Sequence, residues 1–576
     1  MTFPPALIMI LGAVILAALP RRLRSAAAVA VPVITLVHLW ALPDGAVLSL
    51  DALGYTLEPL RVDSLSRVFG AIFAIVAAAG GIYAWHVRET GQQVAALVYG
   101  GAAIGIAFAG DLLTLLAFTE VMAVFSTYLI WARRTEETRR AGIRYLLVHL
   151  AGGATLMAGV LMHLGRTGDL AVGAMDPAHL SSWVMLVGVA VNGAIPPLHS
   201  WLPDAYPKAT ITGAVFLSAF TTKSSVYVLV RMFSGYEILI YLGVAMTLYG
   251  VVYAVLANDI RGILAYHIVS QVGFMVAGAG IGTELAVNGA VAHAFSHILY
   301  KGLLFMGAGA AIYTTGRHRL TELGGLYRSQ RWIFWLYMVG AFSISGFPLF
   351  NGFISKSMVI SGAGEAHYET VMLLLLLASI GTFFSIGLKL PYGAWFGPNS
   401  ADVTPRAAPV NMYVGMGLVA ALCVLFGVAP GILYRYLPYA VEYHPYSLDH
   451  LVETVQILAL TFAGFWLLRG KLAGEAKVAL DTDWLYRRPA PYLRRRAVVA
   501  TARVFAAVER YGDLGAAAAA RLLRNPAPAV QRLLGAAGPS DPGAGFDADD
   551  ARTPLAAALG LVLLAAVALG LAALLS

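Results

Sequence analysis

Residues 292 to 301 read AHAFSHILYK and lie within a long apolar run near the middle of the chain. If this run is a helix, the spacing of four residues places His293, His297 and Lys301 one above another on a single face. A charged side chain at the centre of a bilayer costs at least about 2.5 kcal/mol. Ionisable groups in this position therefore predict a functional site inside a membrane.

The composition is that of a polytopic membrane protein. Hydrophobic residues make up 59% of the 576 and charged residues only 12%, and a mean hydropathy of +0.75 lies far above that of a soluble domain. The net charge of +8 is carried by short loops and one late segment, which fits membrane topology better than nucleic-acid binding. The single Cys423 supports neither an intrachain disulfide nor a Cys-based metal site.

Apolar runs of about 20 residues predict an all-α protein with about sixteen membrane-spanning helices. The first run has no positive residues before it and no cleavage site after it, so we expect a permanent span rather than a signal peptide. Lys and Arg cluster after the first, fifth and eleventh runs, which places these loops in the cytoplasm and both termini outside. The expected spans cover residues 4–19, 26–42, 62–85, 94–110, 112–132, 141–163, 181–197, 210–233, 238–256, 262–282, 285–313, 331–350, 368–396, 408–433, 452–469 and 555–575.

The composition changes after residue 469, where Arg, Ala and Gly become frequent. Residues 494 to 523 predict an amphipathic helix, and residues 525 to 550 predict a linker rich in Pro, Gly and Asp. An Arg-bearing helix held between two spans is typical of a helix that lies along the cytoplasmic membrane surface. The alternative is a soluble tail without a partner.

Two ionisable residues stand out in the first half of the chain. Glu120 is a lone carboxylate near the middle of its span, which indicates a function and a cationic partner on another helix. Lys223 lies among hydroxyl groups in FLSAFTTKSSV, residues 216 to 226. Hydroxyls satisfy backbone groups where a membrane helix is broken, and transporters use a broken helix with a buried charge for ion sites.

The second half contains further polar groups within apolar runs. His267 adds an imidazole to the tenth span. Lys356 follows the twelfth span, and we expect it near the outer surface, where its amine reaches water. Lys389 lies inside the thirteenth span, two residues before Pro391. Like Lys223, it is a lysine in an interrupted span, and two such spans are what an internal structural repeat would produce.

Prolines mark the expected helix breaks, because proline lacks the backbone N–H and clashes with the preceding turn. The segment IPPLHSWLPDAYPK, residues 195 to 208, is too rich in proline to continue a helix and predicts a cytoplasmic loop or re-entrant segment. Gly, Pro and Asn interrupt the twelfth span in the same way. The expected breaks lie at Pro196, Pro197, Pro203, Pro348 and Pro391.

The two histidines of the opening stretch have structural alternatives. A zinc site is one, but no third ligand lies at a suitable spacing, so no metal is expected. A hydrogen-bonded pair that only packs two helices is the other, and it accounts poorly for Lys301, whose ammonium needs several partners. No haem, iron–sulfur, flavin or nucleotide motif is visible, so no cofactor is expected.

These motifs together resemble the antiporter-like subunits of respiratory complex I, membrane-bound hydrogenases and Mrp-type cation/proton antiporters, most of all the D-type subunits of the Mrp antiporters. The similarity spans roughly residues 60 to 397, and the order of the motifs is specific for the superfamily. The extension at 470–576 is similar to the lateral-helix arm of the largest complex I subunit of this type and departs from a minimal D-type Mrp subunit. The motifs are Glu120, PPLHSWLPDA at 196–205, Lys223, NDIR at 258–261, LAY at 264–266, the histidines with Lys301, SGFP at 345–348 and GLKLP at 387–391.

The resemblance implies two inverted five-helix repeats, each with one broken helix, around a central line of buried Glu, Lys and His that carries protons. Glu120 and Lys223 would pair in the first half-channel, Lys301 would be the central relay, and Lys389 would be the outlet of the second. The two histidines of the opening stretch would bridge the halves. The expected relay comprises Glu120, Lys223, His267, His293, His297, Lys301 and Lys389.

This organisation divides the chain into six expected segments. They are residues 1–110 (N-terminal helices), 111–256 (first half-channel repeat), 257–400 (second repeat), 401–470 (C-terminal helices), 471–554 (cytoplasmic amphipathic and linker segment) and 555–576 (final span).

The function that we expect is proton translocation by a membrane subunit of a multi-subunit Na⁺ or K⁺/proton antiporter in a prokaryotic cytoplasmic membrane. Its partners would be other membrane subunits, the lipid bilayer, protons and the cation, with no nucleic acid. One alternative is the proton-pumping, non-redox subunit of a complex I-like NADH-quinone oxidoreductase or membrane-bound hydrogenase. Another is a membrane scaffold for inorganic carbon uptake.

Overall fold

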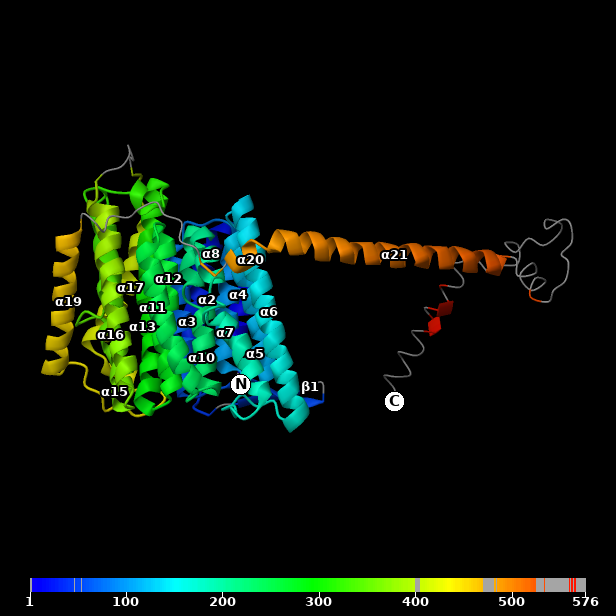
Figure 1. Ribbon diagram of the computed structural model, residues 1–576, viewed down its shortest axis with the longest axis horizontal. Coiled ribbons are helices and arrows are strands. Elements are labelled where there is room, and N and C mark those ends of the chain that lie inside the picture. The colour runs from blue at the N-terminus through cyan, green and yellow to red at the C-terminus, as the bar shows by residue number, and fades with distance from the viewer. Residues whose placement is uncertain are drawn as a thin grey trace. The chain divides into compact units, whose positions relative to one another are not determined.

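The computed structural model describes residues 3–45, 47–52, 54–398, 405–469, 481–482 and 484–524, with isolated positions at 533, 559, 561–562 and 564–565. The chain divides into two units, residues 1–482 and 483–576, which are described separately. The first unit is a helical bundle (Figure 1). The second contains α20 (Trp484–Arg487) and the 35-residue helix α21 (Ala490–Arg524), which covers the region expected to be amphipathic.

Twelve helices within the described part of the chain are long and apolar enough to cross a membrane. The prediction of an all-α polytopic membrane protein is confirmed, whereas the expected span at 555–575 lies outside the described residues apart from isolated positions. The twelve are α2 (Arg21–Ala41), α3 (Ser64–Tyr83), α4 (Thr90–Phe108), α5 (Leu112–Trp131), α6 (Glu136–Thr167), α9 with α10 (Ile211–Leu217 and Thr221–Met232), α11 (Glu237–Leu256), α12 (Ile260–Ile281), α13 (Glu284–Thr315), α16 with its continuation (Glu369–Phe396), α17 (Val410–Val428) and α19 (Leu448–Leu468).

Shorter elements complete the bundle. An antiparallel hairpin of β1 (Val47–Ala52) and β2 (Tyr55–Arg61), which the hydropathy pattern did not predict, occupies one of the loops poor in Lys and Arg. The short helical elements are α1 (Pro5–Ala18), α7 (Leu180–Asn192), α8 (Trp201–Ala205), η1 (Tyr206–Lys208), η2 (Leu320–Glu322), α14 (Arg331–Ser345), α15 (Asn351–Glu365) and α18 (Gly431–Tyr434).

Two of the helices that cross the bundle are discontinuous. The first consists of α9 and α10, which are separated by residues 218–220. The second consists of α14 and α15, which are separated by residues 346–350, where Gly346 takes a left-handed φ of 78°. The expected twelfth span therefore continues beyond residue 350 to Glu365.

The prolines have different effects on their helices. Pro196 and Pro197 lie in the turn between α7 and α8, and Pro348 lies in the break between α14 and α15. Pro203, in contrast, is inside the first turn of α8, where no N–H is required for a helical bond. Pro391 does not end its helix either, because π-helical turns η3 (Phe383–Lys389) and η4 (Tyr392–Phe396) flank it and accommodate the ring. These last two positions correct the sequence-based expectation of a break.

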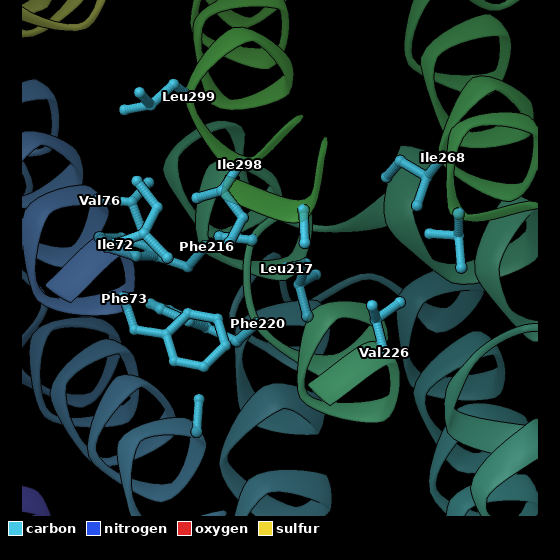
Figure 2. Packing of buried hydrophobic residues seen from close by; sticks show 14 of the residues in the cluster. Ile72, Phe73, Val76, Phe216, Leu217, Phe220, Val226, Ile268, Ile298 and Leu299 are labelled. Carbon is cyan, nitrogen blue, oxygen red and sulfur yellow. The ribbon is translucent and has the colours of Figure 1, made fainter. Parts of the chain in front are cut away.

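The most deeply buried of the twelve helices are α12, α13 and the discontinuous helix formed by α9 and α10. Figure 2 shows how aliphatic and aromatic side chains of α3, α9, α10, α12 and α13 pack around the first helix break. Phe220, in this break, has its ring 5.6 Å from Phe73 and 4.9 Å from Tyr99. The Tyr99 hydroxyl lies 2.6 Å from Thr221 Oγ1 and accepts a hydrogen bond from Thr221 N. Packing from α3 and α4 therefore fixes the place where the helix opens.

Candidate functional site

Lys223 is positioned by the first helix break. Its side chain is fully buried in α10, and Nζ donates to the Ser218 carbonyl at 2.6 Å and to Thr222 Oγ1 at 3.1 Å. Ser218 follows the last residue of α9, so its carbonyl is available because the helix does not continue. The broken helix thus supplies the acceptor that a buried ammonium requires, as the hydroxyl-rich sequence suggested.

Glu120 lies in α5 against Gly153 of α6. A Cβ added at Gly153 would come within 1.6 Å of Glu120 Oε1, so the glycine leaves the space that the carboxylate occupies. Glu120 is half-buried. Both Glu120 and Lys223 are described, and no ion pair or hydrogen bond joins them, because Lys223 Nζ donates to Ser218 and Thr222 instead.

The central helix α13 carries His293, His297 and Lys301, all fully buried. Lys301 Nζ and both ring nitrogens of His297 have no hydrogen-bond partner among the described residues. The His297 ring lies 6.4 Å from that of His293 and 5.2 Å from that of Tyr300. The helix α13, which carries Lys301, packs against both α10, which carries Lys223, and α15, which carries Lys356.

His293 connects α13 to the second broken helix. Its Nδ1 lies 3.1 Å from Ser355 Oγ on α15, and its Nε2 lies 3.3 Å from the Tyr300 hydroxyl. Tyr300 in turn donates to Gln271 Oε1 of α12 at 3.5 Å. A line of polar groups therefore leads from α13 to α15 and to α12.

Lys356 corrects the sequence-based expectation of a surface lysine. It is 3% exposed, and Nζ donates to the Ile344 carbonyl at 2.6 Å and to Ser379 Oγ at 3.3 Å. Ile344 lies at the end of α14, directly before the break, so Lys356 repeats the arrangement of Lys223 at the second discontinuous helix. The signal in the sequence is the Gly-Phe-Pro interruption, which lies eight to ten residues before the lysine.

His267 and Lys389 meet at the π-helical element η3, which contains both Lys389 and the serine that His267 contacts. His267 Nε2 lies 2.5 Å from Ser385 Oγ of η3, inside the bundle. Lys389 Nζ donates to the carbonyls of Val255 and Ala257, at 2.5 and 3.1 Å. These carbonyls lie at the C-terminal end of α11, so Lys389 caps a helix terminus and does not lie beside a break.

Asp481 is a buried acid that the sequence did not single out. Its side chain is 6% exposed and lies 3.2 Å from His199 Nε2, while the hydroxyls of Tyr249 and Tyr266 donate to it at 2.5 and 2.7 Å. Burial alone would raise the pKa of the Asp481 carboxyl, but these hydrogen bonds outweigh it and hold the pKa well below its usual range. Only the tertiary structure brings this acid next to His199, which belongs to the proline-rich motif.

The fold and the site together define a class of protein. The protein is a helical bundle with two discontinuous helices, each of which supplies a carbonyl to a buried lysine, and buried imidazoles accompany these lysines. Members of this class move protons or cations through the interior of a membrane protein. Within it, the chain belongs to the NADH:quinone oxidoreductase/Mrp antiporter transmembrane family, whose model matches residues 109–385. It is therefore a multi-pass protein of the prokaryotic cytoplasmic membrane.

Relatives come from both branches of this family. The D-type subunit of the Na⁺/H⁺ antiporter of Alkalihalophilus pseudofirmus is 31% identical over 354 residues, which cover 58% of this chain and 71% of that protein. The N-type subunit of the NADH-quinone oxidoreductase of Desulforudis audaxviator is 30% identical over 365 residues, covering 60% and 72%. The solved Mrp complex from Dietzia sp. DQ12-45-1b contains a chain of the same fold, with a TM-score of 0.68 at 22% identity, covering 81% of this chain and 99% of that chain.

Proposed function

We propose that this chain is the proton-translocating membrane subunit of a multi-subunit Na⁺ or K⁺/proton antiporter. The observation that carries the proposal is the series of three buried amines: Lys223 and Lys356 at the two helix breaks, with Lys301 between them on α13. The similarity to the D-type subunit of an Na⁺/H⁺ antiporter supports the choice of an antiporter. Its partners are the other membrane subunits of such an assembly.

Repulsion between the amines couples their charges. Two ammonium groups in a low-dielectric interior disfavour each other, so a proton that arrives on one promotes loss of a proton from the next. The carbonyl partners of Lys223 and Lys356 stabilise a charge at each end of the series. Lys301 has no such acceptor among the described residues, so its charge depends on its neighbours.

The imidazoles provide the transfers between amines. His297 and His293 lie one turn apart on α13, and His293 contacts Ser355, the residue before Lys356. Imidazole both accepts and donates protons near neutral pH, so these groups suit the step from α13 to the second helix break. His267 extends the polar groups from α12 to Ser385.

The proposal is tested by replacing Lys301 with methionine, which has similar length but no charge. Everted vesicles that contain the full complex are loaded with a proton gradient, and the loss of this gradient on addition of Na⁺ or K⁺ is recorded. We expect Lys301→Met to abolish exchange while the complex assembles normally. The control is Asp513→Asn in α21, which removes an exposed charge. Unimpaired exchange in Lys301→Met would refute the proposal.

A proton-pumping subunit of a redox complex is the second candidate, because the N-type subunit of an NADH-quinone oxidoreductase is nearly as similar. Purification of the chain with its native partners distinguishes the two. Small antiporter subunits and cation-dependent proton movement identify an antiporter, whereas partner subunits with redox centres and electron-driven pumping identify a redox complex. The neighbouring genes also distinguish an antiporter from a redox complex, and they are easier to examine than the purified assembly.

A further inference from the structure

A cavity lined by both apolar and polar side chains, here called the polar cavity, adjoins Lys356. Its volume is about 200 Å³, and it lies between α15, α16 and α19. Lys356 and its partner Ser379 both line it. The cavity is large enough for several water molecules and offers them polar partners. The remaining polar lining is formed by Ser345, Ser357, Ser361, His450, Glu453, Thr454 and Thr461.

The first turns of α19 contribute His450 and Glu453 to the lining of this cavity, and the distribution of Lys and Arg predicts that this end of α19 faces outside. His450 stacks on Phe353 of α15 with the ring centroids 4.7 Å apart and the planes 15° from parallel. Its Nδ1 lies 2.7 Å from the Pro445 carbonyl. Because a carbonyl only accepts, Nδ1 carries a proton and Nε2 of the neutral ring is the nitrogen that can take up another. Glu453, one turn further along α19, adds a carboxylate to the same lining.

The lining of the gap between α19 and the bundle becomes apolar towards the expected cytoplasmic end of α19. A second cavity of about 480 Å³ lies there, and its lining is almost entirely apolar. Phe342 and Phe347 contribute from the region of the second break, and Phe462 and Trp466 contribute from α19. Water and ions enter an apolar space of this kind only at a large free-energy cost. Polar groups therefore line the gap from Lys356 towards the outer face, whereas apolar side chains line it towards the cytoplasmic face.

We propose that the polar cavity is the outlet by which Lys356 exchanges protons with the outer side of the membrane, with Glu453 and His450 as its outermost proton carriers. This inference rests on the proposed proton-translocating function. It assigns α19, through Glu453 and His450, to the transport machinery. A proton leaves Lys356 for water in the cavity, passes to the Glu453 carboxylate or His450 Nε2, and is released outside.

Accessibility of introduced cysteines tests the outlet without measuring transport. The native Cys423 is fully buried and is replaced by serine to give a cysteine-free background. Thr454→Cys lines the polar cavity, and Ala459→Cys, on the same helix, lines the apolar one. We expect a membrane-impermeant cationic thiol reagent, added to the outer side of right-side-out vesicles with the full complex, to label Thr454→Cys at least tenfold faster. Equal or slower labelling at position 454 would overturn the proposal.

The carboxylate is tested by Glu453→Gln, with Glu369→Gln as the control. Both acids lie on the outer side of the bundle, but Glu369 does not line the cavity. Loss of a positioned proton carrier typically costs ~10²-fold or more in rate, so we expect Glu453→Gln to slow exchange by at least about tenfold and Glu369→Gln to leave it unchanged. Normal exchange in Glu453→Gln, with exchange abolished in Lys301→Met, would place the outlet elsewhere and leave the proposed function intact. Normal exchange in Lys301→Met would refute both.

Discussion

Replacing Gly153 by alanine tests whether the position of the Glu120 carboxylate controls transport. The new Cβ would lie 1.6 Å from Glu120 Oε1, whereas ordinary contacts begin near 3.4 Å, so the oxygen must move by about 1.8 Å. The end of a glutamate side chain can rotate away, so the backbone need not shift. Alanine also favours a helix by about 1 kcal/mol relative to glycine. We therefore expect the variant to fold and assemble while its carboxylate is displaced.

Displacement of the Glu120 carboxylate should lower the rate of proton-coupled cation exchange. A misplacement of about 1 Å at a reacting group can cost ~10²-fold in rate. We expect Gly153→Ala to reduce proton-coupled cation exchange by about 10- to 100-fold on this basis. The assay is the collapse of a proton gradient in everted vesicles on addition of Na⁺ or K⁺. The thermal midpoint of the purified complex, measured in parallel, should stay constant or rise.

The control is Gly165→Ala on the same helix. A Cβ at this position meets nothing within 4 Å, so the substitution gives the same change in helix propensity without a collision. Exchange by Gly165→Ala should equal that of the wild type. Wild-type exchange in Gly153→Ala, or an equal loss in both variants, would refute the reasoning. In a Glu120→Ala background, Gly153→Ala should cause no further loss, because the two residues act through one contact.

Two further predictions concern charged groups outside the spans. The hydrogen bond that His318 Nδ1 donates to Asp259 raises the pKa of His318 above 6.5. This pair therefore stabilises the fold fully below that pH and loses its effect as the pH rises through the raised pKa. The thermal midpoint of the complex should fall over this range, and His318→Gln should remove that part of the slope. In the wild type, two tyrosine hydroxyls donate hydrogen bonds to the charged Asp481 carboxylate, and Asp481→Asn weakens both bonds. We expect the free energy of unfolding to fall by about 1–3 kcal/mol. The exposed control is Asp449→Asn, and an equal, unchanged thermal midpoint in both variants would contradict this prediction.

Hydropathy predicted most of the fold because lipid-facing helices must be apolar. The same reasoning failed for α15, whose sequence NGFISKSMVISGAGE is rich in Gly and Ser. This helix is buried by other helices and therefore needs no apolar surface. The expected span ended at residue 350 for that reason, and Lys356 was placed at the surface.

The candidate site was predicted in part. The buried histidines with Lys301 follow from helical spacing, and Lys223 follows from its hydroxyl-rich break. Asp481 could not be predicted, since its burial arises from Tyr249 and Tyr266, which lie more than two hundred residues earlier in the chain. The contribution of α19 to a polar cavity also depends on tertiary packing.

The different hydrogen bonding of the three buried lysines leads us to expect that Lys301 controls proton transfer among them. Lys223 and Lys356 each donate to a carbonyl left free by a helix break, so local hydrogen bonds stabilise the charge at both ends. Lys301, fully buried between them, has no such partner among the described residues. Its protonation therefore costs most when both neighbours are charged and less when one of them is neutral. Under the proposed function, a proton reaches Lys301 only after one of the two end lysines has released its own, and this condition couples the two ends without a large movement of the helices.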